Sequence, residues 1–212
     1  MSLTILAFMG SPRIKGLCSQ FAASALQGAA SLGAEVRQIN LVDCDIRHCT
    51  GCHSCVYTKH ELPIGMCPLK DDMAGILEQY LAADGYVMAC PVYDFTVTSI
   101  MKAFIERRFP MYKKQKGLHG KIPEVRVPQG FKKKAVLIAT GDASDEYAAI
   151  AEPCFDVMSG HFMVEEIDVV SQLYVGYIHN VDEQRFKEKM QETFTMGARL
   201  VEEIEKARLQ KP

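Results

Sequence analysis

The sequence predicts an α/β fold in which helices cover both faces of a parallel sheet. Short apolar runs typical of buried strands alternate with longer stretches of helical spacing along the 212 residues. Turn residues end several of these runs, as at Gly10-Ser11-Pro12 and at Pro91. Strands that alternate with helices favour a parallel sheet, because right-handed crossovers place the helices on its faces. The length suits a single domain over residues 1–212 that carries long loops.

The first three elements follow these turn signals closely. An apolar run over residues 3–9 is the first predicted strand, and it ends at Gly10. Apolar residues then keep helical spacing from Phe21 to Ala29, which predicts a helix that ends near Gly33. Residues 35–42 alternate between polar and apolar side chains, so they are the second predicted strand.

A cysteine-rich loop, defined here as residues 44–70, interrupts this pattern because it has no clear periodicity. The acidic pair at 71–72 is a good N-terminal signal for the helix that follows it. Residues 85–90 are the third predicted strand, and residues 97–109 are a helix that stops before a proline.

The second half opens with a basic irregular insertion at residues 110–134. Glu124 is the only acid among its lysines and arginines. The segment could attract the phosphates of NAD(P)H, but we expect a solvated loop. The remaining predicted elements are, in order, a strand at 135–139, a helix at 147–158, a strand at 162–170 and a helix at 182–209.

Composition excludes several classes of protein. Hydrophobic residues make up 48% and charged residues 24%, which is typical of globular and not of disordered or fibrous chains. The formal net charge is only −2, so we expect no nucleic-acid partner. No apolar run approaches the roughly 18 residues of a membrane helix. The first apolar run, residues 3–9, is not preceded by the basic segment of a signal peptide. The chain is therefore predicted to be cytoplasmic, with reduced cysteines and no membrane partner.

Two loops are placed to bind a ligand. Ligands of such sheets bind beyond the carboxyl ends of the strands where the strand order reverses, which lies between strands one and three in the common order 2-1-3-4-5. The first loop, residues 10–19, leads into a helix whose free N–H groups and dipole favour a phosphate. It matches neither the dinucleotide-binding nor the Walker glycine pattern, and an ordinary turn is the alternative.

The second loop, residues 91–98, contains Tyr93 and Phe95. These rings can pack against a planar ligand, or they can simply cover the top of the core. A further loop after the fourth predicted strand places Thr140 and Gly141 where they can close the same crevice.

Together these segments resemble the flavodoxin-like NAD(P)H-dependent FMN reductases, and in particular the subgroup that contains the iron-sulfur flavoproteins. The shared motifs keep the family's order over about the first half of the chain. They are Gly10-Ser11-Pro12-Arg13 with Gly16, Cys49-Thr50-Gly51-Cys52-His53-Ser54-Cys55, Cys67 with Asp71-Asp72-Met73, Ala83-Asp84, Pro91-Val92-Tyr93 and Met101-Lys102-Ala103-Phe104-Ile105-Glu106-Arg107.

The resemblance implies a flavodoxin-like three-layer sandwich with a five-stranded parallel sheet in the order 2-1-3-4-5, and a bound FMN. The residues that it implies for the phosphate are Ser11, Arg13, Cys18 and Ser19. Those that it implies for the isoalloxazine are Pro91, Val92, Tyr93, Asp94, Phe95 and Thr96. Leu17 stands where family members often carry Asn, so one side-chain donor to the phosphate is missing.

Four cysteines are candidate metal ligands. Cys49, Cys52 and Cys55 follow one another at two-residue gaps, and Cys67 comes after eleven more residues. Such spacing lets thiolates converge on a [4Fe–4S] cluster or on zinc, while free thiols are the third possibility. If a cluster is present, these four cysteines are its predicted ligands. Other side chains that can substitute are Cys44, His48, His53 and His60.

The predicted function is the oxidation of NAD(P)H by bound FMN, with the electrons passed to a small-molecule or protein acceptor. Because the flavin performs this chemistry, no side chain is predicted as a catalytic acid or base. The alternatives are an iron-sulfur flavoprotein that carries electrons through FMN and a [4Fe–4S] cluster, and a non-catalytic flavin-binding module. We also expect a homodimer or homotetramer, because the resemblance implies flavin sites near a subunit boundary and the segment from Val92 to Ile100 presents an apolar face.

Overall fold

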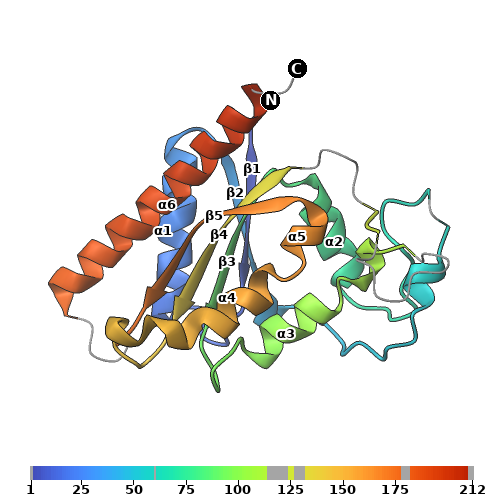
Figure 1. The fold of residues 1–212 in the computed structure, drawn as a ribbon, viewed down its shortest axis with the longest axis horizontal. Coiled ribbons are helices and arrows are strands. Elements are labelled where there is room, and N and C mark those ends of the chain that lie inside the picture. Colours follow the sequence, from blue (N-terminus) through green and yellow to red (C-terminus); the bar gives the residue numbers. More distant parts are fainter. Residues whose placement is uncertain (1, 60, 114–123, 127–131, 178–181, 210–212) are drawn as a thin grey trace.

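The computed structural model describes residues 2–59, 61–113, 124–126, 132–177 and 182–209. Five strands form one sheet in the order β2-β1-β3-β4-β5, and every neighbouring pair is parallel. The strands are β1 (Thr4–Met9), β2 (Glu35–Asn40), β3 (Gly85–Pro91), β4 (Lys133–Thr140) and β5 (Ile167–Val175). The predicted fold class and strand order are confirmed (Figure 1).

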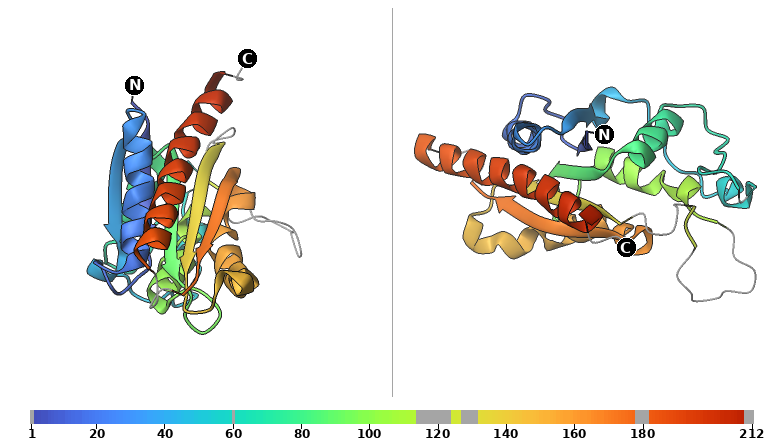
Figure 2. Two further views of the ribbon diagram at one scale, coloured as in Figure 1. Left: turned by 90° about the vertical axis from the view of Figure 1, so that its left-hand side faces the viewer. Right: turned by 90° about the horizontal axis from the view of Figure 1, so that it is seen from above.

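Helices cover both faces of this sheet. Helices α1 (Leu17–Ser31) and α6 (Glu183–Leu209) lie side by side on one face (Figure 2). The other face carries α2 (Met73–Ala82), α3 (Ser99–Glu106), α4 (Glu152–Ser159) and the single turn α5 (Phe162–Glu165). Successive residues of β1 point to opposite faces, so Ile5 and Ala7 join one buried cluster while Leu6 and Phe8 join the other. The result is three layers with a core on each side of the sheet.

Two glycines let α1 and α6 approach each other closely. A Cβ atom on Gly197 would lie 1.7 Å from the carbonyl oxygen of Ala25, and one on Gly28 would lie 1.9 Å from that of Phe194. No side chain fits at such distances, so the two helices pack backbone against backbone.

The predicted strand at residues 162–170 is wrong in its first half. Phe162 to Glu165 form the turn of α5, Glu166 has a left-handed φ of 55°, and β5 begins only at Ile167. The reason is tertiary, because Phe162 and Glu165 are both buried on one face of the turn and the carboxylate of Glu165 pairs with buried Arg108. A strand would direct these two side chains to opposite faces.

Other differences are smaller. The helix predicted at 97–109 begins only at Ser99, because Thr98 caps it by accepting the N–H of Met101 at 3.2 Å. The helix predicted at 147–158 begins as a 3₁₀ segment, Asp145–Ala151, before α4. No helix in the described ranges is long and apolar enough to cross a membrane.

Two residues of the basic insertion differ from the predicted solvated state, whereas Lys132 is exposed as predicted. Arg126 is only 6% exposed, and Lys133, which opens β4, is buried as well. The rest of this insertion, residues 114–123 and 127–131, lies outside the described residues.

Candidate functional site

A cavity of about 370 Å³ lies at the carboxyl edge of the sheet, between the loops that follow β1, β3 and β4. It sits at the predicted reversal of strand order, and its volume is within the range of small-molecule sites. The predicted site residues that line it are Ser11, Arg13, Cys18, Pro91, Val92, Tyr93, Thr140 and Gly141.

The loop after β1 forms the polar end of the cavity. Gly16 precedes α1, whose first turn contains no acidic residue. Within the described chain, no acceptor receives the N–H groups of Leu17, Cys18 and Ser19. Such free groups at a helix N-terminus attract an anion.

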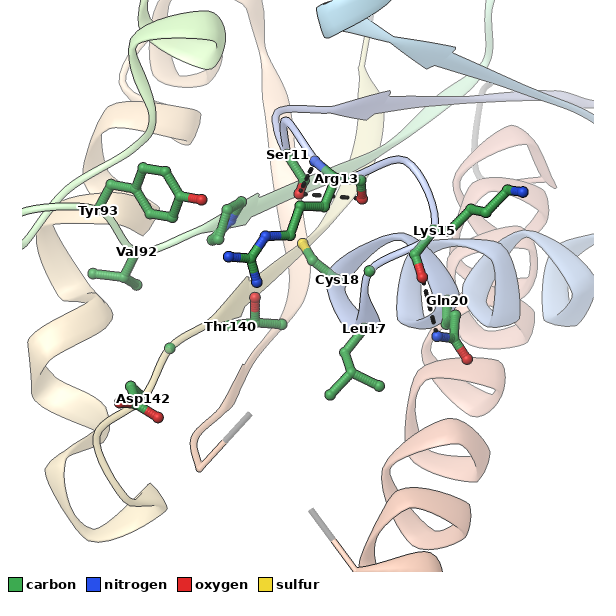
Figure 3. Close-up of a pocket in the computed structure, with 13 residues that line it drawn as sticks. Ser11, Arg13, Lys15, Leu17, Cys18, Gln20, Val92, Tyr93, Thr140 and Asp142 are labelled. Carbon is green, nitrogen blue, oxygen red and sulfur yellow. Dashed lines mark hydrogen bonds between the residues drawn. The ribbon is translucent and has the colours of Figure 1, made fainter. Parts of the chain in front are cut away.

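Arg13 adds a positive charge to this end. The hydroxyl of Ser11 accepts the Arg13 N–H at 3.1 Å, which fixes the loop locally. The guanidinium makes no ion pair with any described residue, and Figure 3 shows it reaching across the cavity toward Thr140 and Val92. It is therefore available to a ligand.

Close packing holds the first loop against α3. The hydroxyl of Thr98 donates to the carbonyl oxygen of Gly10 at 2.6 Å. A Cβ atom on Gly10 would lie 2.8 Å from Cβ of Met101, so a larger residue would push the loop away from the helix.

The opposite wall consists of the loops after β3 and β4. Val92 donates its N–H to the carbonyl of Thr140 at 2.7 Å, which ties the two loops together. The hydroxyl of Thr140 is buried beside the Cys18 thiol. Burial, and then the neighbouring Cys90, raise the pKa of the Cys18 thiol, so this lining residue stays neutral.

Four predicted site residues do not line the cavity. The hydroxyl of Ser19 accepts from Gln38 at 3.4 Å, on the side of β2. Asp94, Phe95 and Thr96 form a tight turn beyond the cavity wall, with left-handed φ values of 46° at Asp94 and 62° at Phe95. Their role in binding stays a prediction.

Further residues of the lining were not among the predicted binding residues, although all but Gln20 belong to loops that the sequence indicated. The additional residues are Lys15, Gly16, Leu17, Gln20 and Asp142. Helical spacing from Gly16 places Gln20 one turn further along α1, so this position could have been found from the sequence.

The donor set fits a phosphate joined to a planar ring system. Free N–H groups and the Arg13 guanidinium gather at one end, while Pro91 to Tyr93 and Gly141 form a largely non-ionic wall at the other. FMN combines these two chemical features.

A second cavity, of about 280 Å³, brings together all four predicted metal ligands. Its lining includes Cys49, Cys52, Cys55 and Cys67, together with His53, Glu106 and Phe109. Cys44 is not part of this lining, and its thiol donates to the carbonyl of Asn40 at 3.5 Å. His60 lies outside the described residues.

These four thiols line one cavity, as the ligands of a cluster would. Among the described residues, no three His, Cys, Asp or Glu side chains lie close enough to hold one metal ion. Zinc would need each sulfur at about 2.3 Å. A [4Fe–4S] cluster places its own iron and sulfide atoms between the thiolates and so occupies a cavity. The pKa of the Cys52 thiol is lowered, first by the side chain and N–H of Ser54 and then by Thr50, which favours the ligating thiolate.

Arg107 supports this loop at its C-terminal side. Its buried guanidinium donates to both carboxylate oxygens of Asp71, to the carbonyl of Arg47 at 2.7 Å and to Sγ of Cys67 at 3.6 Å. Burial acts to raise the pKa of Asp71, but the hydrogen bonds from Arg107 and from backbone N–H groups bring it below its usual value.

Arg126 supports the middle of the loop. Its guanidinium donates to five backbone carbonyls at 2.7 to 3.4 Å, which belong to Cys55, Thr58, Lys59, Leu62 and Tyr112. Burial lowers the pKa of Arg126. A residue of the basic insertion therefore shapes the cysteine-rich loop, and no pattern in the sequence predicts this contact.

Comparison with known proteins agrees with this geometry. The model of the NADPH-dependent FMN reductase family matches residues 3–165. An iron-sulfur flavoprotein of Archaeoglobus fulgidus is 35% identical over 102 residues, which are 48% of this chain and 44% of that protein. An iron-sulfur flavoprotein of Methanocaldococcus jannaschii is 33% identical over 109 residues, or 51% of this chain and 53% of that protein. The chain spans about half the length of the curated relatives it matches.

Solved structures share the fold. A NAD(P)H:quinone oxidoreductase from Methanothermobacter marburgensis superposes with a TM-score of 0.73 at 16% identity, covering 94% of this chain and 100% of that one. An FMN-dependent NADH-azoreductase from Bacillus anthracis, solved in complex with FMN, gives a TM-score of 0.66 at 15% identity, covering 95% of this chain and 100% of that one. At these identities the likeness extends to the fold alone.

Proposed function

Because this chain belongs to the NADPH-dependent FMN reductase family, we propose that it binds FMN at the carboxyl edge of its sheet and oxidises NAD(P)H. The electrons then pass to a small-molecule or protein acceptor. The observation that carries this proposal is the first cavity, where unpaired N–H groups and a free guanidinium face a wall formed by the loops after β3 and β4.

The chain's own residues bind and orient the cofactor. Arg13 and the N–H groups of Leu17, Cys18 and Ser19 hold the phosphate, which needs charge-assisted donors. The segment from Pro91 to Tyr93 holds the ring. When bound, FMN supplies the hydride and one-electron chemistry, so no side chain has to transfer a proton.

Removal of the Arg13 guanidinium tests the phosphate site. Arg13→Ala should lose roughly 1.5 to 3 kcal/mol of binding free energy, which raises the Kd of FMN about tenfold or more. Titration of the apoprotein, followed by the change in flavin fluorescence, measures this Kd. Arg37→Ala, a matched change at an exposed position of β2, should leave it unchanged.

Two results would contradict the proposal. Unchanged FMN affinity in Arg13→Ala would remove Arg13 from the site. Failure of the unmutated protein to bind FMN, or to oxidise either NADH or NADPH once loaded, would reject the function as a whole.

A second candidate function is that of an iron-sulfur flavoprotein, favoured by the convergence of four cysteines on the second cavity. Cys49, Cys52, Cys55 and Cys67 would hold a [4Fe–4S] cluster, which supplies a one-electron centre. The eleven-residue gap before Cys67 adds little entropic cost, because loop closure depends only logarithmically on length.

Iron content distinguishes the two candidates. After anaerobic reconstitution, the wild type should contain iron and acid-labile sulfide, and Cys52→Ala should contain much less. Cys44→Ala, which removes a nearby thiol outside the cavity, should resemble the wild type. Wild type without iron would leave an FMN-dependent oxidoreductase alone, and equal iron in Cys52→Ala would show that the ligands are misassigned.

A further inference from the structure

The positive charge of Arg126 makes no ion pair with any described residue, and among the described carboxylates it is Glu61 that lies near enough to act on it. All of its acceptors in the described chain are backbone carbonyls, and none of its side-chain nitrogens pairs with an acid. The segments outside the described residues contain no Asp or Glu that could provide one. Burying a cation without an ion-pair partner is costly, so further negative charge close to Arg126 would be stabilised there.

Besides Glu61, the anions close to Arg126 are the thiolates of the second cavity, and that of Cys55 acts on its charge. The segment that Arg126 binds begins at Cys55, whose carbonyl accepts from the guanidinium at 3.4 Å. Cysteines that ligate a metal are deprotonated, so four of them bring net negative charge into the cavity. This negative charge then compensates the positive charge of buried Arg126.

Arg107 acts on the same cavity more directly. One of its N–H groups points to Sγ of Cys67 at 3.6 Å, while the others bind Asp71 and the Arg47 carbonyl. The guanidinium is only 2% exposed, so water screens little of its charge. Hydrogen bonds to ligand sulfurs and nearby charge are two of the factors that set the potential of iron-sulfur centres.

We propose that Arg107 and Arg126 are positioning residues that raise the reduction potential of an iron-sulfur centre held by the cysteine-rich loop. The inference rests on the second candidate function above. Reduction adds one electron and makes the centre more negative by one charge, and the two guanidinium groups stabilise that added charge. A centre bound by these cysteines is therefore easier to reduce than it would be without the two guanidinium groups.

The two arginines differ in how they act, which makes the proposal testable. Arg126 contributes its charge, since its N–H groups all bind carbonyls. The charge of Arg107 is partly offset by its buried ion pair with Asp71, so its main contribution is a hydrogen-bond donor to sulfur. Lysine keeps the charge but lacks the planar fork that reaches several acceptors at once. Arg126→Lys should therefore keep the potential, whereas Arg107→Lys should lower it.

The experiment is a redox titration of the FMN-loaded, reconstituted protein, with the reduced centre followed by electron paramagnetic resonance. Arg107→Gln and Arg126→Gln should each reduce the equilibrium constant for one-electron reduction at least tenfold, which corresponds to a potential about 59 mV lower. Arg199→Gln removes the same charge from an exposed position of α6 and should leave the potential unchanged. Iron and sulfide content, measured on each sample, shows that the centre is intact.

Several outcomes overturn the inference. Intact centres with wild-type potentials in both Gln variants would do so. If the Gln variants lose their iron, the potentials of Arg107→Lys and Arg126→Lys are measured in their place. Equal potentials in Arg107→Lys and the wild type would reject the proposal. A wild type that takes up no iron also rejects it, whereas the FMN proposal is judged separately by NAD(P)H oxidation in the same preparation.

Discussion

At the scale of single residues, a buried ion pair explains a local feature that the sequence hides. Arg108 and Glu165 are both fully buried and paired, and the hydroxyl of Tyr80 donates to Glu165 at 2.5 Å. The ring of Tyr80 stacks on that of Tyr86 with centroids 4.3 Å apart. Breaking such a pair typically costs 3 to 5 kcal/mol, so Glu165 is held inward and residues 162–165 form a helical turn.

The sequence could not predict this turn for a physical reason. Phe162, Met163 and Val164 form an apolar run that suits a strand locally. The partner of Glu165 lies 57 residues away, and nothing in the local pattern reveals it. Buried polar contacts at long range therefore limit what periodicity can predict.

His161 gives a prediction of pH dependence at this scale. Burial first, and then the charges of Arg108 and Lys102, lower its pKa from 6.5 to about 4, and its ring contacts the hydroxyl of Tyr112. Between pH 6.5 and 4 the unfolded chain binds a proton here that the folded chain does not. The free energy of unfolding should therefore fall as the pH falls through this range, by up to roughly 3 kcal/mol from this residue.

Urea unfolding at a series of pH values between 7.5 and 4 measures this effect. His161→Gln, which keeps an acceptor for Tyr112, should lose less stability over the same range. An identical pH dependence in the two proteins would mean that other groups cause the acid destabilisation.

At the scale of elements, the first half of the chain was predicted well because each element there has a clear period and a turn residue at its end. β1, β2 and β3 lie within two residues of the predicted strands. Helix α3 is shorter than predicted, and at its start the reason is a side-chain cap at Thr98. Periodicity alone does not locate such a cap. The conformation of the cysteine-rich loop depends on hydrogen bonds from Arg107 and Arg126, which are distant from it in sequence.

The contact between α1 and α6 gives a prediction about packing. Gly197→Ala should destabilise the protein by about 1 to 3 kcal/mol, because the new Cβ would meet the Ala25 backbone. Gly75→Ala, on the exposed side of α2, has open space around it and should instead stabilise by about 0.5 to 1 kcal/mol.

Urea unfolding of both variants beside the wild type gives the two differences. Opposite signs are expected, since both changes favour a helical backbone and only one causes a clash. A Gly197→Ala protein as stable as the wild type would show that α6 can move away from α1 at little cost.

At the scale of the whole molecule, the location of the first cavity was predictable because topology alone determines it. Any doubly wound sheet opens a crevice where its strand order reverses, and the sequence showed which loops meet there. Which way each side chain points was not predictable. Phe95 illustrates this, because its left-handed backbone directs the ring outward, where it is 66% exposed.

Self-association is the last prediction, and it follows from exposed apolar side chains at this same edge. Every loop at the carboxyl end of the sheet exposes at least one of them: Ile14, Val42, Tyr93, Phe95, Tyr147 and Tyr177. Exposed apolar surface gathered in one region is typical of an interface, and a homodimer would cover it. Size-exclusion chromatography with light scattering should therefore give at least twice the monomer mass of 23.6 kDa at micromolar concentration.

Charged substitutions test whether this edge is the interface. The double variant Phe95→Glu and Tyr147→Glu should be monomeric, because its carboxylates would be buried against apolar side chains of the second copy. Leu209→Glu, at a position 86% exposed near the far end of α6, should keep the wild-type mass. A monomeric wild type would refute the prediction, and a double variant of unchanged mass would place the interface on another face of the molecule.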